Sequence, residues 1–313
     1  MLRSAEDLDR LPVRRHEHAP VCAPEFLSVS AGLQFSISDE QFSALGFGCS
    51  RQEEKANSSA LWETYERLLM VAELSGSLGR PVEGRSKGGT QADSRPFQHI
   101  VPRPWHDTYR EGQDATGLAI HTTGVAAERA AERELTERAL LAALWYGTTP
   151  IRSEAADHNF VTTGRLRTYS FPCHLGYFSL AAWHDPRSQI LVAGSAVRDS
   201  LDEAIEHAAG EAVMVFDGVW QGRTPRYSTH TSRDRYASLR GDLHTARAEH
   251  LETRLTGGRG SVSYPLDVAD DDMVFYRLID WEDVCLVRAV SGRLPTPGTL
   301  RSRVGEVPAD PFT

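Results

Sequence analysis

The chain has 313 residues, 40% of them hydrophobic and 25% charged, so it can bury one large core or two small ones. Its formal net charge of -9 argues against nucleic acid or an anionic membrane as a partner, because both need a basic patch. The sequence contains neither a membrane-spanning apolar run nor a secretory signal peptide, so we expect a cytoplasmic protein.

The N-terminal region mixes charge, proline and histidine without periodicity, so we predict a loosely ordered arm over residues 1–25 and a single domain over 26–313. Residues 75–96 are rich in glycine, serine and charged side chains and predict a long mobile loop. Further loops are expected at 221–234 and 256–260. Prolines in residues 293–313 predict an extended tail.

Short apolar segments at 178–183, 190–194 and 284–290 are typical of β-strands. They alternate with helical patterns, which predicts an α+β or α/β fold. The four cysteines are far apart, without a Cys-x-x-Cys pair or a histidine at zinc-ligand spacing, so we expect reduced thiols.

One helical motif recurs three times along the chain. In each copy an alanine stands seven residues before a glutamate, and a glycine-containing turn is predicted further upstream. The unit is therefore predicted to be strand, turn, helix. The copies are Ala56, Glu63, Glu66 and Arg67; Ala127, Glu134, Glu137 and Arg138; and Ala204, Glu211 and Met214.

The two glutamates of a copy lie on one helix face, since they are three residues apart. They could be ordinary solvated ion-pair partners of Arg67 and Arg138, each pair worth about 0.3–0.5 kcal/mol. The neighbouring residues favour a core-facing position instead. Carboxylates gathered there repel one another, and a divalent cation would relieve the repulsion. Magnesium prefers carboxylate, phosphate and water oxygens, so the repeat suggests Mg-ATP. These neighbours are Ser59, Trp62 and Leu69 around Glu66, and Ala130, Leu140, Leu141 and Leu144 around Glu137.

The repeat resembles the YcaO family. The matching segments are GFGCS from Gly46, SALWETYER from Ser59, GLA from Gly117, ELTER from Glu134, VAGSAV from Val192, VCLVRAVSGRL from Val284 and PADPFT from Pro308. The resemblance implies a YcaO-type α+β fold in which β-sheets pack against helices that carry the repeated Glu-x-x-Glu motifs.

Members of this family use ATP and Mg2+ to phosphorylate a backbone amide oxygen of a peptide, so that a nucleophile can add to the activated carbon. The resemblance implies formation of thiazoline or oxazoline rings, thioamides or amidines in ribosomal peptide natural products such as antibiotics. It implies a precursor peptide, a separate leader-binding protein and a homodimer as partners. Carried over by position, the metal ligands are Glu63, Glu66, Glu134, Glu137 and Glu211, and the nucleotide-binding residues are Ser59, Arg67 and Arg138.

Several positions depart from the family pattern. Phe47 replaces a lysine, Ala126 a glutamate, and Met214 and Val215 a glutamine and an arginine. Further changes are Thr116 for an asparagine, and His121 and Thr122 for a glycine-asparagine pair. A degenerate, non-catalytic partner or scaffold subunit is therefore the alternative to an enzyme. Candidate substitutes for the lost charges are Glu128, Arg129, Arg133, Arg233 and Arg235.

Two other kinds of site fit the sequence less well. A nucleophile triad could be drawn from Ser50, His99 and Asp107, but the sequence has no Gly-x-Ser-x-Gly elbow. A carboxylate-bundle metal site would require Glu-x-x-His pairs, which the motif helices lack.

Overall fold

The computed structural model describes residues 3–37, 39–76, 80–96, 100, 116–146, 153–221, 244–256, 273–292 and 294. In chain order the elements are α1 (Ala5–Asp9), β1 (Arg14–His18), β2 (Leu27–Ile37), β3 (Glu40–Ser50), α2 (Glu53–Gly76), β4 (Pro81–Ser86), β5 (Gln91–Pro96), β6 (Leu118–His121), α3 (Gly124–Tyr146), β7 (Glu154–His158), β8 (Arg165–Cys173), β9 (Gly176–Asp185), β10 (Ile190–Arg198), α4 (Leu201–Trp220), α6 (His244–Thr256), β11 (Met273–Asp280) and β12 (Cys285–Ser291).

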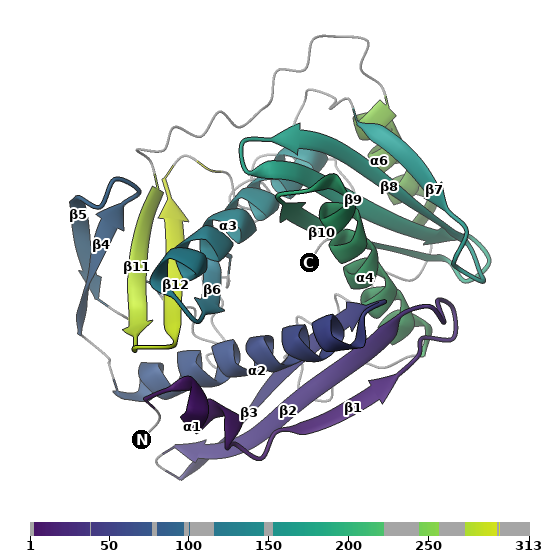
Figure 1. Cartoon of the computed structure of the whole chain (residues 1–313). Helices are drawn as coiled ribbons and strands as arrows, with labels where there is room; N and C mark the ends of the chain where they lie inside the picture. The colour runs from purple at the N-terminus through teal and green to yellow at the C-terminus, as the bar shows by residue number, and fades with distance from the viewer. Residues whose placement is uncertain are drawn as a thin grey trace.

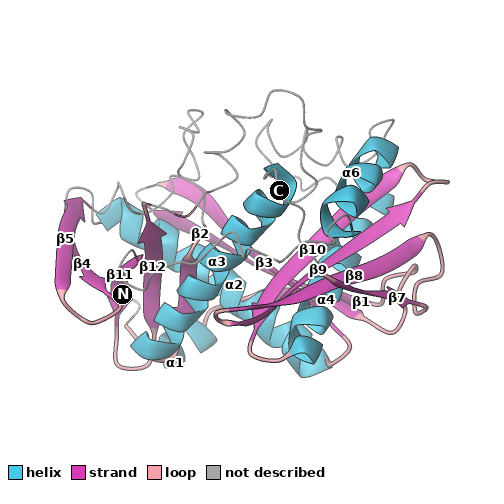
Figure 2. Cartoon of the chain, turned by 90° about the horizontal axis from the view of Figure 1, so that it is seen from above, coloured by secondary structure: helices cyan, strands magenta, loops and turns pink. Residues whose placement is uncertain are grey.

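The described chain forms three antiparallel sheets, and each sheet carries one long helix (Figures 1 and 2). The first unit is the sheet β1-β2-β3 with α2. The second is the sheet β5-β4-β11-β12-β6 with α3, and the third is the sheet β10-β9-β8-β7 with α4. In every unit the strand that immediately precedes the helix, namely β3, β6 or β10, lies at an edge of its sheet. The predicted α+β fold is confirmed.

The three helices also connect the units in a cycle. Besides its own sheet, α2 contacts β6 of the second unit, α3 contacts β10 of the third, and α4 contacts β3 of the first. In Figure 1 the helices form the three sides of a triangle, with the sheets outside it. The inner sides of the three helices, which lie far apart in the sequence, therefore face one another.

Glycines set the distance between strand and helix in two of the units. A Cβ atom on Gly46 would lie 2.1 Å from the Ala60 carbonyl oxygen, and one on Gly194 would lie 2.4 Å from that of Ala208. Both glycines lie inside strands, β3 and β10, so the predicted glycine turns are wrong there. Only Gly117, with φ +78°, precedes its strand in a turn. The glycines of β3 and β10 therefore serve close packing of backbone on backbone.

The N-terminal region is ordered, against the prediction of a loose arm over residues 1–25. Ser4 caps α1 by accepting a hydrogen bond from the Asp7 N–H, and Leu8 is fully buried. The Ala5 N–H donates to the carboxylate of Asp283. Because β1 pairs with β2 along its whole length, long-range pairing orders a segment that has no periodicity of its own.

Residues 75–96 also differ from the predicted mobile loop. After the end of α2, β4 and β5 form a hairpin that joins β11 through β4. Gly89, with φ +81°, forms its turn, and Val82 packs into the core. Polar composition suggested a loop because this hairpin is the exposed outer end of its sheet, where few apolar residues are needed.

The predicted strands and motif helices are confirmed by β9, β10, β12, α2, α3 and α4. All four cysteines are free thiols, as expected. Most of the predicted loops at 221–234 and 256–260 and of the tail at 293–313 lie outside the described residues. In the part of the chain that the structure describes, no helix is both long and apolar enough to cross a membrane.

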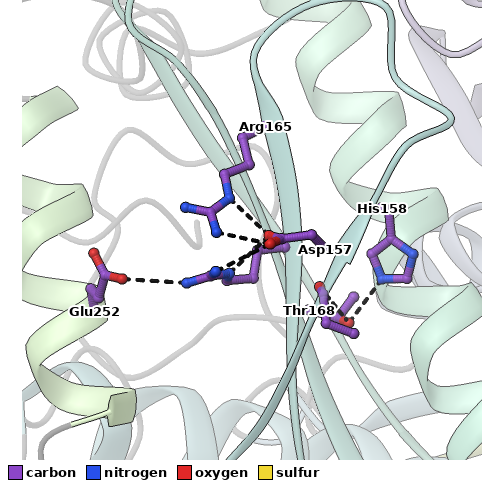
Figure 3. Close-up of polar contacts among 7 residues, drawn as sticks. Asp157, His158, Arg165, Thr168 and Glu252 are labelled. Carbon is purple, nitrogen blue, oxygen red and sulfur yellow. Dashed lines mark hydrogen bonds and ion pairs between the residues drawn. The ribbon is translucent and has the colours of Figure 1, made fainter.

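A charged network ties the outer strand β7 to β8 and α6 (Figure 3). Asp157 accepts hydrogen bonds from Arg165 at 2.8 and 2.8 Å and from Arg167 at 2.9 and 3.2 Å. Arg167 also donates to Glu252 at 3.3 Å, and His158 bonds Thr168 at 2.9 Å. The arginine and carboxylate charges balance on an exposed surface, so we infer that the network stabilises the packing of β7, β8 and α6 only modestly.

Two glycines on α4 give a test of the contact between the third and first units. A Cβ on Gly210 would lie 2.3 Å from the Cys49 carbonyl oxygen of β3, whereas one on Gly218 would meet nothing within 4 Å. We expect Gly210→Ala to lower the free energy of unfolding by about 1–3 kcal/mol through overpacking. Gly218→Ala should raise it by about 0.5–1 kcal/mol, because alanine favours helix. Chemical denaturation measures both, and equal effects would contradict the close contact.

Candidate functional site

The first glutamate of α2 is held at the free edge of β3. The Phe47 N–H donates to Glu63 Oε2 at 2.6 Å, and Arg67, one helical turn further on, pairs with the other carboxylate oxygen. Because β3 is an edge strand, this N–H has no strand partner, and the glutamate accepts from it instead. The Glu63 side chain keeps 32% of its surface exposed, so the carboxylate remains accessible.

The third unit repeats this arrangement on α4. The Ser195 N–H of edge strand β10 donates to Glu211 Oε2 at 2.7 Å, across the same sixteen-residue spacing as Phe47 and Glu63. Ser195 makes a second bond, since its hydroxyl donates to Glu137 Oε1 of α3 at 2.6 Å. Ser195 thus joins glutamates from two helices.

The five predicted glutamates come together electrostatically. Burial raises the pKa of Glu66 well above its ordinary value, and the Glu134 and Glu63 carboxylates raise it further. Burial likewise raises the pKa of Glu63, with Glu211 adding to the rise. For Glu137, burial raises the pKa, Arg138 opposes the rise and Glu211 adds to it. Glutamates of α2, α3 and α4 therefore affect one another's pKa, and these five residues are called the glutamate cluster below.

Two arginines that the sequence interpretation missed face this cluster. Arg288 of β12 is 7% exposed and lowers the pKa of Glu66. Arg198, at the end of β10, lowers that of Glu137 and donates to His207 Nδ1 at 3.1 Å. Burial and the Arg198 charge lower the pKa of His207 to about 4. The sequence could have indicated Arg288, because it is the single charged residue in the apolar segment 284–290 and a buried charge requires a partner.

Solved structures that are similar to this chain identify its fold. YcaO from Methanopyrus kandleri, bound with AMPPCP and Mg2+, is 15% identical over 96% of this chain and 90% of that chain, with a TM-score of 0.64. The chain has the YcaO fold. The E. coli microcin synthetase McbBCD complex gives 12% identity over 83% and 87%, with a TM-score of 0.57. A heterocyclase in complex with substrate and cofactor gives 13% identity over 90% of this chain and 50% of that chain, with a TM-score of 0.56. Searches of protein-family models and of curated proteins gave no match.

Within this YcaO fold the glutamates suit magnesium bound together with a phosphate ligand. Among the described residues, no three His, Cys, Asp or Glu side chains are placed to hold a metal by themselves. Magnesium is commonly bound through one or two carboxylates, with phosphate and water oxygens completing its shell. The all-oxygen donors and the mutual repulsion of the carboxylates fit that mode of binding.

Other predicted residues have different surroundings. Ser59 is exposed at the surface of α2, so its expected core-facing position is wrong. Arg138 acts on Glu137, as described above, and Arg67 pairs with Glu63. Ser50 donates to Glu206 at 3.2 Å, and its proposed triad partners His99 and Asp107 lie outside the described residues.

Three of the candidate substitutes form ion pairs with residues outside the five glutamates. Glu128 pairs with Arg277 at 3.0 Å, while Arg129 and Arg133 both pair with Asp199. Arg198 and Arg288, by contrast, act on Glu137 and Glu66 of the cluster. Arg233 and Arg235 lie outside the described residues.

A cavity of about 530 Å³ lies beside α3 and contains none of the five glutamates. Glu132 is buried there, with Lys87 at 3.1 Å and His174 at 3.9 Å. Glu132 stands two residues from Glu134 and therefore projects from nearly the opposite side of the helix. The cavity is thus separate from the glutamate cluster.

The raised glutamate pKa values predict a pH dependence of stability in metal-free solution. A carboxyl group whose pKa is higher in the folded state than in the unfolded state stabilises the fold at pH values below its unfolded pKa. This stability is lost as pH rises through the folded pKa. The free energy of unfolding should therefore fall from weakly acidic to mildly alkaline pH, and Glu66→Gln should reduce the fall and raise the melting temperature by several degrees at the alkaline end.

Glu54→Gln, at an exposed position of the same helix, is the matched control and should leave the pH profile unchanged. Thermal unfolding across the pH range measures both variants. A lower melting temperature for Glu66→Gln at alkaline pH would mean that the charged Glu66 carboxylate stabilises the fold. It would contradict the inference that neighbouring carboxylates repel Glu66.

Proposed function

We propose that the chain binds Mg-ATP at the glutamate cluster and uses it to activate a backbone amide of a peptide by O-phosphorylation. The observation that supports the proposal most directly is the mutual effect of five carboxylates from three helices on their pKa values, with edge-strand N–H groups fixing Glu63 and Glu211. Such a cluster is costly unless cations bind to it. The YcaO fold, of which one solved example is bound with AMPPCP and Mg2+, makes a magnesium nucleotide the fitting ligand.

The chain's own residues have separate tasks in this proposal. Glu66 with Glu134, and Glu137 with Glu211, would hold magnesium, while Arg198 and Arg288, which act on Glu137 and Glu66, would bind the phosphates. Magnesium, when bound, neutralises charge that develops on the transferred phosphoryl group. Arg67 and the Phe47 N–H keep Glu63 oriented, since each binds one of its two oxygens.

The substrate and partners belong to the same proposal. A heterocyclase of this fold was solved with substrate and cofactor, and the microcin synthetase was solved with pro-MccB17 bound. We propose a precursor peptide as substrate and a separate leader-binding protein as partner. Azoline formation by cyclodehydration is the favoured outcome, with thioamide or amidine formation as variants. The homodimer stays a prediction.

Titration calorimetry with Mg-ATP tests nucleotide binding. We expect a dissociation constant in the micromolar to millimolar range, and at least a tenfold loss in Glu63→Gln, because the carboxylate nearest both Phe47 and Glu211 loses its charge. Glu54→Gln on the same helix should bind like the wild type. Unchanged affinity in both Glu63→Gln and Glu134→Ala would refute the cluster as the binding site.

A non-catalytic scaffold is the second candidate, favoured by Phe47 and Met214 at positions where the resembling family carries polar residues. It predicts no heat of Mg-ATP binding and co-purification of a partner subunit. Turnover of ATP with a precursor peptide and a leader-binding protein, measured as phosphate release, would exclude it.

A further inference from the structure

Arg198 is the last residue of β10, the edge strand that contacts both α3 and α4. Side chains alternate between the two faces of a strand. The hydroxyl of Ser195 donates to Glu137 of α3, whereas Gly194 packs against the backbone of α4. Arg198 follows Gly194 by an even number of residues, so its side chain lies on the α4 side of the strand. There it contacts His207 of α4.

The hydrogen bond between Arg198 and His207 has a single possible direction. A guanidinium carries only donors, so the His207 Nδ1 atom accepts the bond, at 3.1 Å, and carries no proton. The other terminal nitrogen of Arg198 donates to the Val197 carbonyl oxygen at 2.7 Å. Burial and the charges of Arg198 and Lys55 lower the pKa of His207 to about 4, so the ring is neutral near pH 7. Both terminal nitrogens therefore have an acceptor that fixes the orientation of the guanidinium.

Carboxylates on both sides of His207 attract Arg198. His207 stands four residues after Glu203 and four before Glu211, so the three side chains follow one face of α4. Burial lowers the pKa of Arg198, and carboxylates from two regions oppose the shift: Glu137 and Glu211 of the glutamate cluster, and Glu203 outside it. Glu203 is exposed in the first turn of α4. The guanidinium thus has one set of partners at the cluster and a competing partner at the surface.

We propose that His207 is a positioning residue that holds Arg198 toward the glutamate cluster and away from Glu203, so that the guanidinium can bind the phosphates of Mg-ATP. This inference rests on the nucleotide-binding function proposed above. A neutral acceptor suits the task, because it fixes the direction of the guanidinium without neutralising it. A carboxylate in the place of His207 would compete with the phosphates for the same charge.

Titration calorimetry with Mg-ATP tests His207 through the position of its acceptor atom. His207→Asn places an oxygen where Nδ1 lies and should bind within about twofold of the wild type. His207→Gln moves the oxygen one bond further out, and His207→Leu removes the acceptor. Both should weaken binding about five- to tenfold. Arg198→Met should weaken it at least about tenfold, and adding His207→Leu to it should change little further, because His207 acts through Arg198.

The competing carboxylate provides a readout that a merely structural histidine would not give. Adding Glu203→Gln to His207→Leu removes the surface partner of Arg198, so affinity for Mg-ATP should recover to within about threefold of the wild type. Glu203→Gln alone is the matched control and should bind like the wild type, because Glu203 is exposed and lies outside the cluster. Thermal unfolding verifies that each variant is folded.

The other outcomes separate this inference from the proposed function. Unchanged affinity in His207→Leu and His207→Gln, or equal losses in His207→Asn and His207→Gln, overturns the positioning role and leaves the proposed function standing. Additive losses in Arg198→Met and His207→Leu, or no recovery with Glu203→Gln, overturn it as well. If the wild type does not bind Mg-ATP, both proposals fail. If His207→Leu does not fold, the comparison of His207→Asn with His207→Gln decides.

Discussion

Carboxylates that are crowded away from bulk water repel one another and lose hydration, and this cost governs the centre of the protein. Glu66 and Glu137 have raised pKa values because they are buried beside other glutamates. The fold offsets part of the cost with arginines and with edge-strand N–H groups. A carboxylate cluster that is only partly compensated in this way attracts cations. The same repulsion between carboxylates that destabilises the empty site would therefore favour binding of magnesium with ATP, as we propose.

The cluster can form because strand and helix pack closely in two of the three motif units. Gly46 and Gly194 bring a strand against the backbone of the following helix, so that the glutamates of α2 and α4 reach over the strand edge. The helices then contact the next unit in a cycle. A larger residue at either glycine would push its helix outward and separate carboxylates that need to approach. Packing and charge placement are therefore coupled.

The cycle is symmetric in backbone but not in chemistry. Ser195 and Glu137 make a polar link at one contact, and Phe47 and Met214 are apolar at the equivalent one.

The sequence by itself determined the three motif helices and the strands β9, β10 and β12, because helical spacing, strand alternation and repetition are local properties. Only the tertiary structure showed that residues 5–18 and 81–96 form regular secondary structure, since strand pairing depends on partners distant in the chain. It also added Arg288 and Arg198 to Arg67 and Arg138 as cations that act on the glutamates. Which charges meet depends on how three sheets close into a cycle, and no local pattern records that closure.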